Sequence, residues 1–142
     1  MSSATPTLVG LIGTLTSPSD PNHIGLEVRT LIESLSREEE TSGDNVIVLH
    51  GGRNTGSVPS TLGYLSDSGL RGLRKIAFPP MSTIDEKVPF NSYQFFVRNK
   101  QIINSADYVI FLADPNRARE AEVDPAIEYC TDIGKRHYIL EI

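Results

Sequence analysis

The stretch His50-Gly-Gly-Arg-Asn-Thr-Gly-Ser57 joins two segments of different character. Asn45–Leu49 before it is a short β-branched run typical of a buried strand, and Val58–Asp67 after it can form a helix. A glycine-rich turn between a strand and a helix is typical of anion sites, because glycine lets the backbone approach a phosphate and the helix start offers unpaired N–H groups. The stretch matches neither GxGxxG nor GxxxxGK(S/T), so a tight turn without a ligand is the alternative interpretation.

The rest of the chain repeats the same alternation of strand and helix. Apolar runs that predict strands are Thr7–Ile12, Leu73–Phe78, Ala106–Leu112 and Arg136–Leu140. Helical spacing predicts helices over Ile24–Leu35, Tyr93–Ile103 and Asp124–Ile133. We expect Asp124 to cap the last helix, with Pro125 just inside it and Gly134 just beyond its end. Such alternation predicts an α/β fold, a single domain over residues 1–142 with a five-stranded parallel sheet and helices on both faces.

Composition limits the function classes. A chain of 142 residues with 39% hydrophobic and 22% charged residues is ordinary for one soluble domain. The net charge of -5 argues against non-specific nucleic-acid binding. We expect no membrane partner, since no apolar run approaches the ~20 residues of a membrane span and no signal peptide pattern is present. The single Cys130 and the lack of metal-type Cys/His spacing favour a cytoplasmic protein with no metal and no cofactor.

Residues suited to binding follow the strands at their carboxyl ends. In parallel sheets ligands bind at these ends, where the strand order reverses. Arg53 could pair with a phosphate or face solvent, and Asp114 and Asn116 could hold ribose hydroxyls or form an Asp-Pro-Asn turn. We expect glycine at 52 to make room for a ligand and glycine at 56 to serve the backbone. The candidate ligand-binding residues are Gly13, Thr14, Gly51, Gly52, Arg53, Thr55, Gly56, Arg98, Asp114 and Asn116.

An acidic cluster spans the loop after the fourth strand and the last helix: Glu120, Glu122, Asp124 and Glu128. One of these carboxylates could stabilise the oxocarbenium-like transition state of glycosidic cleavage, although acids near a helix start need no function. His50 could act as a general acid or base, or be a hydrogen-bonded packing residue. Asp107 is predicted to be a cap or turn residue, and Cys130 a small core residue.

Three segments together resemble the nucleotide-binding Rossmann-like proteins of the SLOG superfamily, which includes the LOG phosphoribohydrolases and DprA-like domains. They are Gly10-Leu-Ile-Gly13, Val46–Gly52 with Gly56, and Arg98-Asn99 followed by Ala106–Ile110. The resemblance implies a Rossmann-like domain that binds a nucleotide or nucleotide-derived ligand, and it adds Asn99 to the candidate ligand-binding residues. The segment Ala126–Lys135 is similar to the helix-to-strand ending of nucleoside deoxyribosyltransferases and TIR-like folds.

Two catalytic motifs of those families are not matched. LOG enzymes carry PGGxGTxxE after the fourth strand, where this chain has Ala113–Arg119 without glycine. Deoxyribosyltransferases place a nucleophilic Glu eight residues before the Gly-Lys pair, where this chain has Ala126. Ligand binding is therefore the leading hypothesis. The alternatives are an N-glycosidic hydrolase or transferase acting on nucleosides or nucleotides, with Glu122, Asp124 or Glu128 as the catalytic carboxylate, and a scaffold that binds a protein partner. Similar proteins often pair through helices, so a homodimer is also expected.

Overall fold

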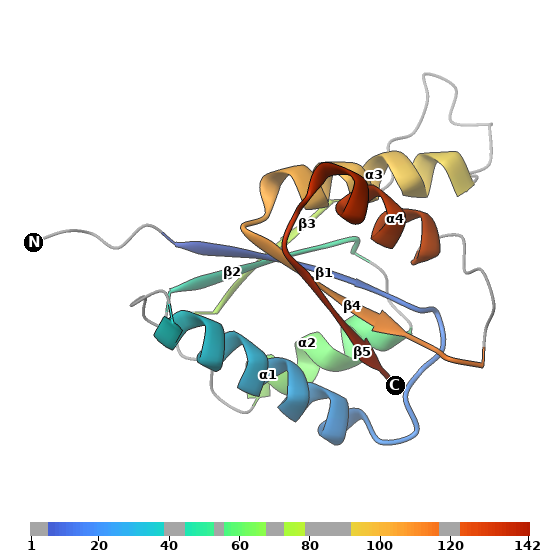
Figure 1. Ribbon diagram of the computed structural model, residues 1–142. Coiled ribbons are helices and arrows are strands. Elements are labelled where there is room, and N and C mark those ends of the chain that lie inside the picture. The colour runs from blue at the N-terminus through green and yellow to red at the C-terminus, as the bar shows by residue number, and fades with distance from the viewer. Residues whose placement is uncertain (1–5, 39–44, 53–55, 68–72, 79–91, 117–122) are drawn as a thin grey trace, which may run out of the picture.

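The computed structural model describes residues 6–38, 45–52, 56–67, 73–78, 92–116 and 123–142. Strands and helices alternate along the chain as the sequence predicts (Figure 1). The elements are β1 (Thr7–Gly13), α1 (Pro21–Glu38), β2 (Val46–His50), α2 (Ser57–Asp67), β3 (Arg74–Ala77), α3 (Ser92–Ser105), β4 (Tyr108–Ala113), α4 (Asp124–Ile133) and β5 (His137–Glu141). None of the helices in these ranges combines the length and the apolar character needed to cross a membrane.

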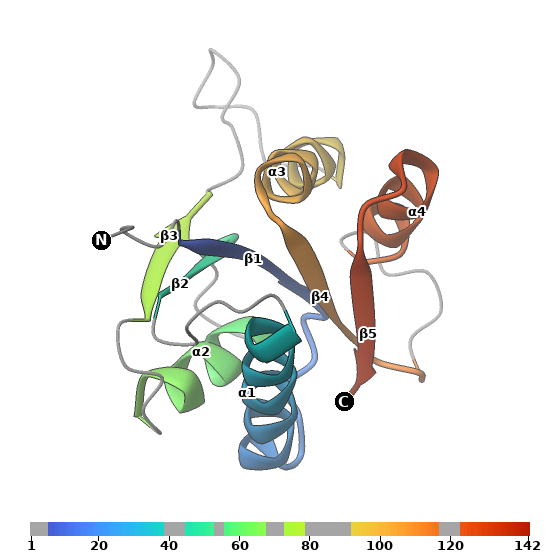
Figure 2. The ribbon, with the colours of Figure 1, turned by 60° about the vertical axis from the view of Figure 1, so that its left-hand side comes forward.

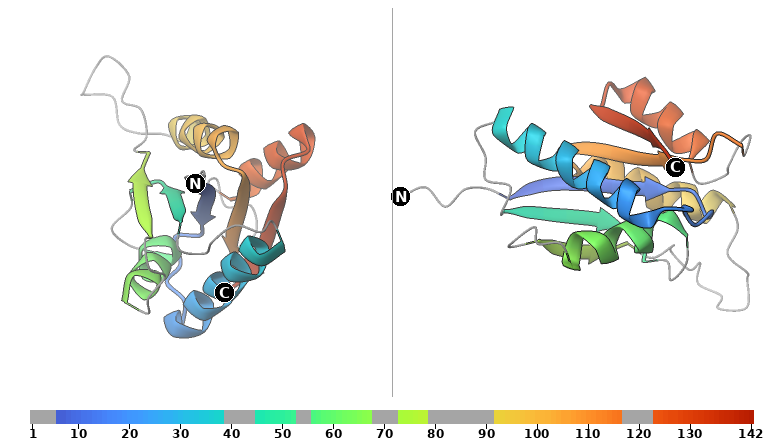
Figure 3. Two further views of the ribbon diagram at one scale, coloured as in Figure 1. Left: turned by 90° about the vertical axis from the view of Figure 1, so that its left-hand side faces the viewer. Right: turned by 90° about the horizontal axis from the view of Figure 1, so that it is seen from below.

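The five strands form one parallel sheet in the order β3-β2-β1-β4-β5. Helices α1 and α2 cover one face and α3 and α4 cover the other, giving three layers (Figures 2 and 3). The α/β fold predicted from the alternation is therefore confirmed. The chain runs outward from β1 through β2 to β3, and then crosses to β4 on the opposite side of β1. The strand order thus reverses between β1 and β4, which is the position where ligands bind in sheets of this kind.

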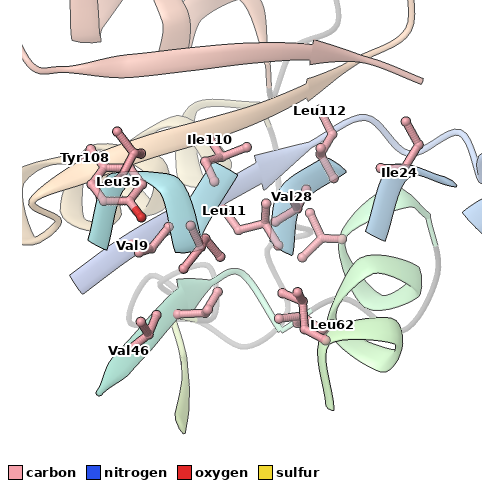
Figure 4. Packing of buried hydrophobic residues seen from close by; sticks show 14 residues of the cluster. Val9, Leu11, Ile24, Val28, Leu35, Val46, Leu62, Tyr108, Ile110 and Leu112 are labelled. Atoms are coloured by element: carbon pink, nitrogen blue, oxygen red, sulfur yellow. The ribbon is translucent and has the colours of Figure 1, made fainter. Parts of the chain in front are cut away.

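The core follows from the apolar runs of the central strands. β1, β2 and β4 are buried on both faces, which explains why their sequences are almost continuously apolar rather than alternating. Val9, Leu11 and Ile110 pack against α1 and α2 (Figure 4), whereas Ile12 and Phe111 belong to the cluster under α3 and α4. The edge strand β3 is exposed throughout, and β5 is exposed in part.

The ends of α4 confirm one sequence prediction and correct another. Gly134 adopts a left-handed conformation (φ 71°), and the Lys135 N–H donates to the Cys130 carbonyl at 2.9 Å, as expected of a glycine that ends a helix. The expected capping by Asp124 is wrong. Val123 occupies the N-cap position without a side-chain cap, and Asp124 lies in the first turn. Val123 is buried and already helical in conformation, so its packing in the core sets the start of the helix.

Asp107 directly precedes β4, at the amino ends of the strands and therefore on the side of the sheet away from the carboxyl rim. Its N–H donates to the Leu8 carbonyl at 2.7 Å, and its carboxylate accepts the Leu8 N–H at 2.8 Å. Asp107 is therefore a turn residue that joins the starts of β1 and β4, as predicted. Cys130 is fully buried in the cluster under α3 and α4, which confirms its assignment to the core.

Candidate functional site

The carboxyl ends of β1 and β4 leave the sheet side by side at the point where the strand order reverses. Gly13 is in register with Leu112, and the Thr14 N–H donates to the Leu112 carbonyl at 2.8 Å. Gly13 and Thr14 are buried, and Asp114 directly follows β4. The structure therefore brings the turn after β1 and the turn after β4 together at one rim.

Helix α2 begins against the end of β1. The Thr14 carbonyl accepts two hydrogen bonds from Ser57, one from its N–H at 3.1 Å and one from its hydroxyl at 2.6 Å. A Cβ atom on Gly13 would overlap the Ser57 hydroxyl and would lie 3.0 Å from a methyl group of Val58. Glycine at 13 is therefore needed for the close approach of α2 to β1. The sequence did not identify Ser57 as a site residue, because its partner is 43 positions away.

The start of α2 differs from that of α1, which covers the same face. Asp20 precedes α1 and accepts the His23 N–H at 3.2 Å, so α1 carries its own negatively charged cap. Gly56 precedes α2 with a φ of 104° and has no side chain that could act as a cap. The first turn of α2 contains no acidic residue either. Within the described residues, the start of α2 therefore lacks a carboxylate that would compete with an external anion.

The turn after β2 is held by its own backbone and by α3. The Gly52 N–H donates to His50 Nδ1 at 3.0 Å, and the Gly51 carbonyl accepts from Arg98 Nη1 at 3.1 Å. A Cβ atom on Gly51 would overlap the Arg98 guanidinium, so glycine at 51 provides space for that group. Gly52 has a φ of 75°, and a Cβ there would meet only Ala77, at 3.4 Å. Glycine at 52 therefore serves the backbone, because this conformation already favours glycine, and the expectation that it also makes room for a ligand stays a prediction.

Arg98 and Asn99 are buried at the middle of α3, with 2% and 1% of their surface exposed. Arg98 Nε donates to Asn99 Oδ1 at 2.7 Å, and its guanidinium lies 5.3 Å from the centroid of the Phe95 ring. These contacts, together with the bond to Gly51, make Arg98 a support for the turn after β2. Burial lowers the pKa of His50, and the nearby charges of Lys75 and Arg98 lower it further. The positive charges of Lys75 and Arg98 therefore act on His50, which begins this turn.

Asp114 and Asn116 form a turn at the end of β4. The Asp114 carboxylate accepts the Asn116 N–H at 2.9 Å, which is the local hydrogen bond of an Asx turn. Asp114 is half-buried and Asn116 is exposed. The two residues therefore form the predicted Asp-Pro-Asn turn. Asp114 lies at the carboxyl end of β4, next to β1.

The described carboxylates of the acidic cluster lie on the surface of α4. Asp124 and Glu128 are exposed one turn apart, whereas Ala126 between them is fully buried. The position where deoxyribosyltransferases carry their nucleophile is thus inside the core. Four sequence-predicted residues lie outside the described ranges: Arg53, Thr55, Glu120 and Glu122. Within the described ranges, no group of three or more His, Cys, Asp or Glu side chains could hold a metal ion.

A hollow of about 720 Å³ opens between the start of α1 and α2. Sequence reasoning did not identify it, because it is formed by residues from two helices that are far apart along the chain. It is open at Gly63, where nothing lies within 4 Å of a Cβ atom. Its polar lining residues are Asn22, Ser60, Tyr64 and Asp67. Ser60 belongs to the first turns of α2, so the hollow adjoins the start of this helix.

No protein-family model matches the chain, and a search of curated proteins finds none with significant similarity.

Proposed function

We propose that the protein binds a nucleotide or a nucleotide-derived ligand at the carboxyl rim, with a phosphate at the start of α2. The observation that carries this proposal is the glycine-preceded start of α2, which has no acidic residue in its first turn and is held against the end of β1 by two hydrogen bonds from Ser57 to Thr14. A helix start of this kind attracts anions through its N–H groups and its partial positive charge. The Ser57 N–H is bonded to Thr14 and Pro59 has no N–H, so Val58 and Ser60 are the first-turn residues whose N–H groups remain for an anion.

Two further features support an anionic ligand. Lys75 and Arg98 lie close enough to His50, at the turn that follows β2, for their positive charges to lower its pKa, and the same charges would attract an anion. Asp114 lies across the point of strand reversal and retains carboxylate lone pairs for hydroxyl groups. A ligand with a phosphate at one end and hydroxyl groups at the other would place its phosphate near the positive charges and its hydroxyl groups near the Asp114 carboxylate.

The catalytic alternative has no comparable support among the described residues. Asp124 and Glu128 are exposed on α4, and Ala126 between them is buried. A carboxylate in open solvent does not provide the fixed, water-excluding environment in which such charges act on a transition state. Binding without bond cleavage is therefore the function that we propose.

The test is thermal unfolding in the presence of nucleosides and of the corresponding mono-, di- and triphosphates. A ligand at about a hundredfold its dissociation constant adds ~2.7 kcal/mol to the free energy of unfolding. We expect stabilisation by at least one phosphorylated compound and none by its parent nucleoside.

Two variants at Gly52 provide a matched pair. Asn and Asp tolerate the left-handed conformation better than other side chains, and they have nearly the same shape. Gly52→Asn and Gly52→Asp should therefore lose similar amounts of stability, whereas the negative charge should weaken phosphate binding in Gly52→Asp alone. Equal stabilisation of both variants by the phosphorylated compound would place its phosphate away from this turn, and no stabilisation of the wild type by any compound would refute the proposal.

A further inference from the structure

β5 forms one border of the sheet, and its outer edge is open in the described part of the chain. β5 pairs with β4 alone, and Figure 2 shows it at the side of the sheet opposite β3. Its sequence, His137-Tyr-Ile-Leu-Glu141, contains no proline and no lysine. Natural edge strands usually carry such residues to prevent pairing with another chain. The other edge strand, β3, carries two positively charged residues, Arg74 and Lys75, whereas β5 carries a single charged residue, Glu141, at its end.

The hydrogen bonds to β4 determine which backbone groups of β5 face outward. The Arg136 carbonyl accepts the Val109 N–H at 3.1 Å, and the Ile142 N–H donates to the Ala113 carbonyl at 2.9 Å. Because backbone groups alternate in direction along a strand, residues 136, 138, 140 and 142 face β4. His137, Ile139 and Glu141 therefore direct both their N–H and their carbonyl groups toward the open edge.

These outward groups match a second copy of the same strand. When two copies lie antiparallel about a two-fold axis at Ile139, Ile139 is opposite itself and His137 is opposite Glu141. Both kinds of pair join residues with outward backbone groups, so each pair can exchange two hydrogen bonds, as antiparallel ladders require. The intervening residues, Tyr138 and Leu140, also lie opposite each other. The open edge is thus complementary to itself in hydrogen bonding.

Side chains on both faces fit the same register. On the face of α3 and α4, an imidazole lies opposite a carboxylate, and the His137 ring is already fixed by its Nδ1–H bond to the Lys135 carbonyl at 2.9 Å. Ile139, 48% exposed, meets its own copy at the axis. On the face of α1, Tyr138 meets Leu140. Polar pairs that can hydrogen-bond and apolar pairs of this kind stabilise neighbouring strands.

Apolar surface continues on the helix beside β5. Leu26 on α1 is 50% exposed, and it lines a groove of about 480 Å³ with Leu31 and Leu140. Leu140 belongs both to this groove and to β5, so a second strand paired with β5 would lie next to the groove. An isolated edge strand would leave this apolar surface in water.

We propose that two copies of this chain associate through β5, antiparallel and centred on Ile139, to give a sheet that continues across the two-fold axis. This association is independent of the ligand proposed for the carboxyl rim. Light scattering should give a mass of about 31 kDa, twice the 15.6 kDa of the chain. The concentration series should run from about 1 μM to about 1 mM, since that range includes weak homodimers.

Two lysine variants test the position of the interface. Ile139→Lys places like charges opposite each other at the axis and should give the monomer mass, with the circular dichroism spectrum unchanged. Ile76→Lys is the matched control, because Ile76 is similarly exposed (46%) in the other edge strand, and this variant should remain a dimer.

Two cysteine variants test the register. The Cα atoms of a hydrogen-bonded antiparallel pair are about 5.5 Å apart, within the range of a disulfide, so Ile139→Cys should cross-link to a covalent dimer on mild oxidation. In the same register the two copies of residue 141 are about 14 Å apart, so Glu141→Cys should not cross-link. The native Cys130 is fully buried and does not compete.

Several results would overturn the proposal. A mass of 15.6 kDa for the wild type throughout the series would show that the chain does not self-associate. A dimer that survives Ile139→Lys, or that fails to cross-link through Ile139→Cys, would place the interface elsewhere, for example on the helices. A monomer that binds the strand of a different protein through β5 would assign the open edge to another occupant.

Discussion

Replacing Gly51 with alanine tests whether Arg98 supports the turn after β2. The added Cβ atom would overlap the guanidinium, which donates to the Gly51 carbonyl at 3.1 Å and to Asn99 Oδ1 at 2.7 Å. Arg98 is 2% exposed, so a displaced guanidinium cannot simply move into solvent. Hydrogen bonds that involve a charged group contribute ~1.5–3 kcal/mol each. We therefore expect Gly51→Ala to lower the free energy of unfolding by ~1.5–3 kcal/mol if one bond is lost and by ~3–6 kcal/mol if both are lost.

Urea unfolding followed by circular dichroism measures this change, provided that the dependence on urea stays the same. Gly63→Ala is the matched control, because no atom lies within 4 Å of a Cβ atom there and the residue is exposed on α2. That variant should gain ~0.5–1 kcal/mol, as alanine is favoured over glycine within a helix.

A double-mutant cycle identifies the cause of the loss. If the guanidinium is the obstacle, Gly51→Ala should be much less harmful in the Arg98→Met background, with a coupling of ~1–3 kcal/mol. Additive effects within ~0.5 kcal/mol, or a Gly51→Ala variant as stable as the wild type, would refute the assignment of Arg98 as the support of this turn.

Two further predictions follow from shifted pKa values. The pKa of His50 is lowered in the folded state, so near and below about pH 6.5 the unfolded chain binds more protons than the folded chain. The free energy of unfolding should therefore fall as the pH is lowered from about 6.5 toward the pKa of His50 in the folded state. Urea midpoints at about pH 7.5 and about pH 5 should therefore differ less in His50→Asn, which keeps an acceptor for the Gly52 N–H; an unchanged difference would contradict this reasoning. Burial raises the pKa of the Cys130 thiol from 9.0 to about 11, so alkylation of the folded protein near pH 8 should be slower than that of the urea-unfolded protein by about 100-fold from the thiolate fraction alone. Equal rates would show that Cys130 is accessible.

The helices and strands could be predicted because each has a characteristic pattern within its own stretch of sequence. The continuous apolar runs of β1 and β4 indicated strands buried on both faces, and Gly134 marked the end of α4. The order of the strands is not recorded in this way, because a helical crossover can lead to either neighbour. Predicting that β4 lies beside β1, rather than beside β3, requires contacts that no local pattern carries.

The candidate site was predictable only in outline. The turns at Gly13, Gly51 and Asp114 could be assigned to one rim, since parallel strands end on the same side of a sheet. The contacts that shape the rim join distant positions: Ser57 and Thr14 are 43 apart, and Arg98 and Gly51 are 47 apart. The role of each glycine could not be predicted. A glycine that makes space for a neighbouring side chain and a glycine with a left-handed backbone cannot be distinguished by sequence alone.

The position of β1 at the centre of the sheet has a consequence for the order in which the protein folds during synthesis. β1 precedes β4 along the chain, yet the two strands are neighbours in the sheet, and the bond between Leu8 and Asp107 joins residues 99 positions apart. The segment from β1 to β3 can assemble with α1 and α2 while the other edge of β1 remains open on the ribosome. Contacts so distant along the chain form slowly, so we expect β4 and β5 to dock after this half-sheet, with one edge of β1 unpaired until then. Pulsed hydrogen exchange during refolding would reveal it as protection of β2 amides that precedes protection of β4 and β5.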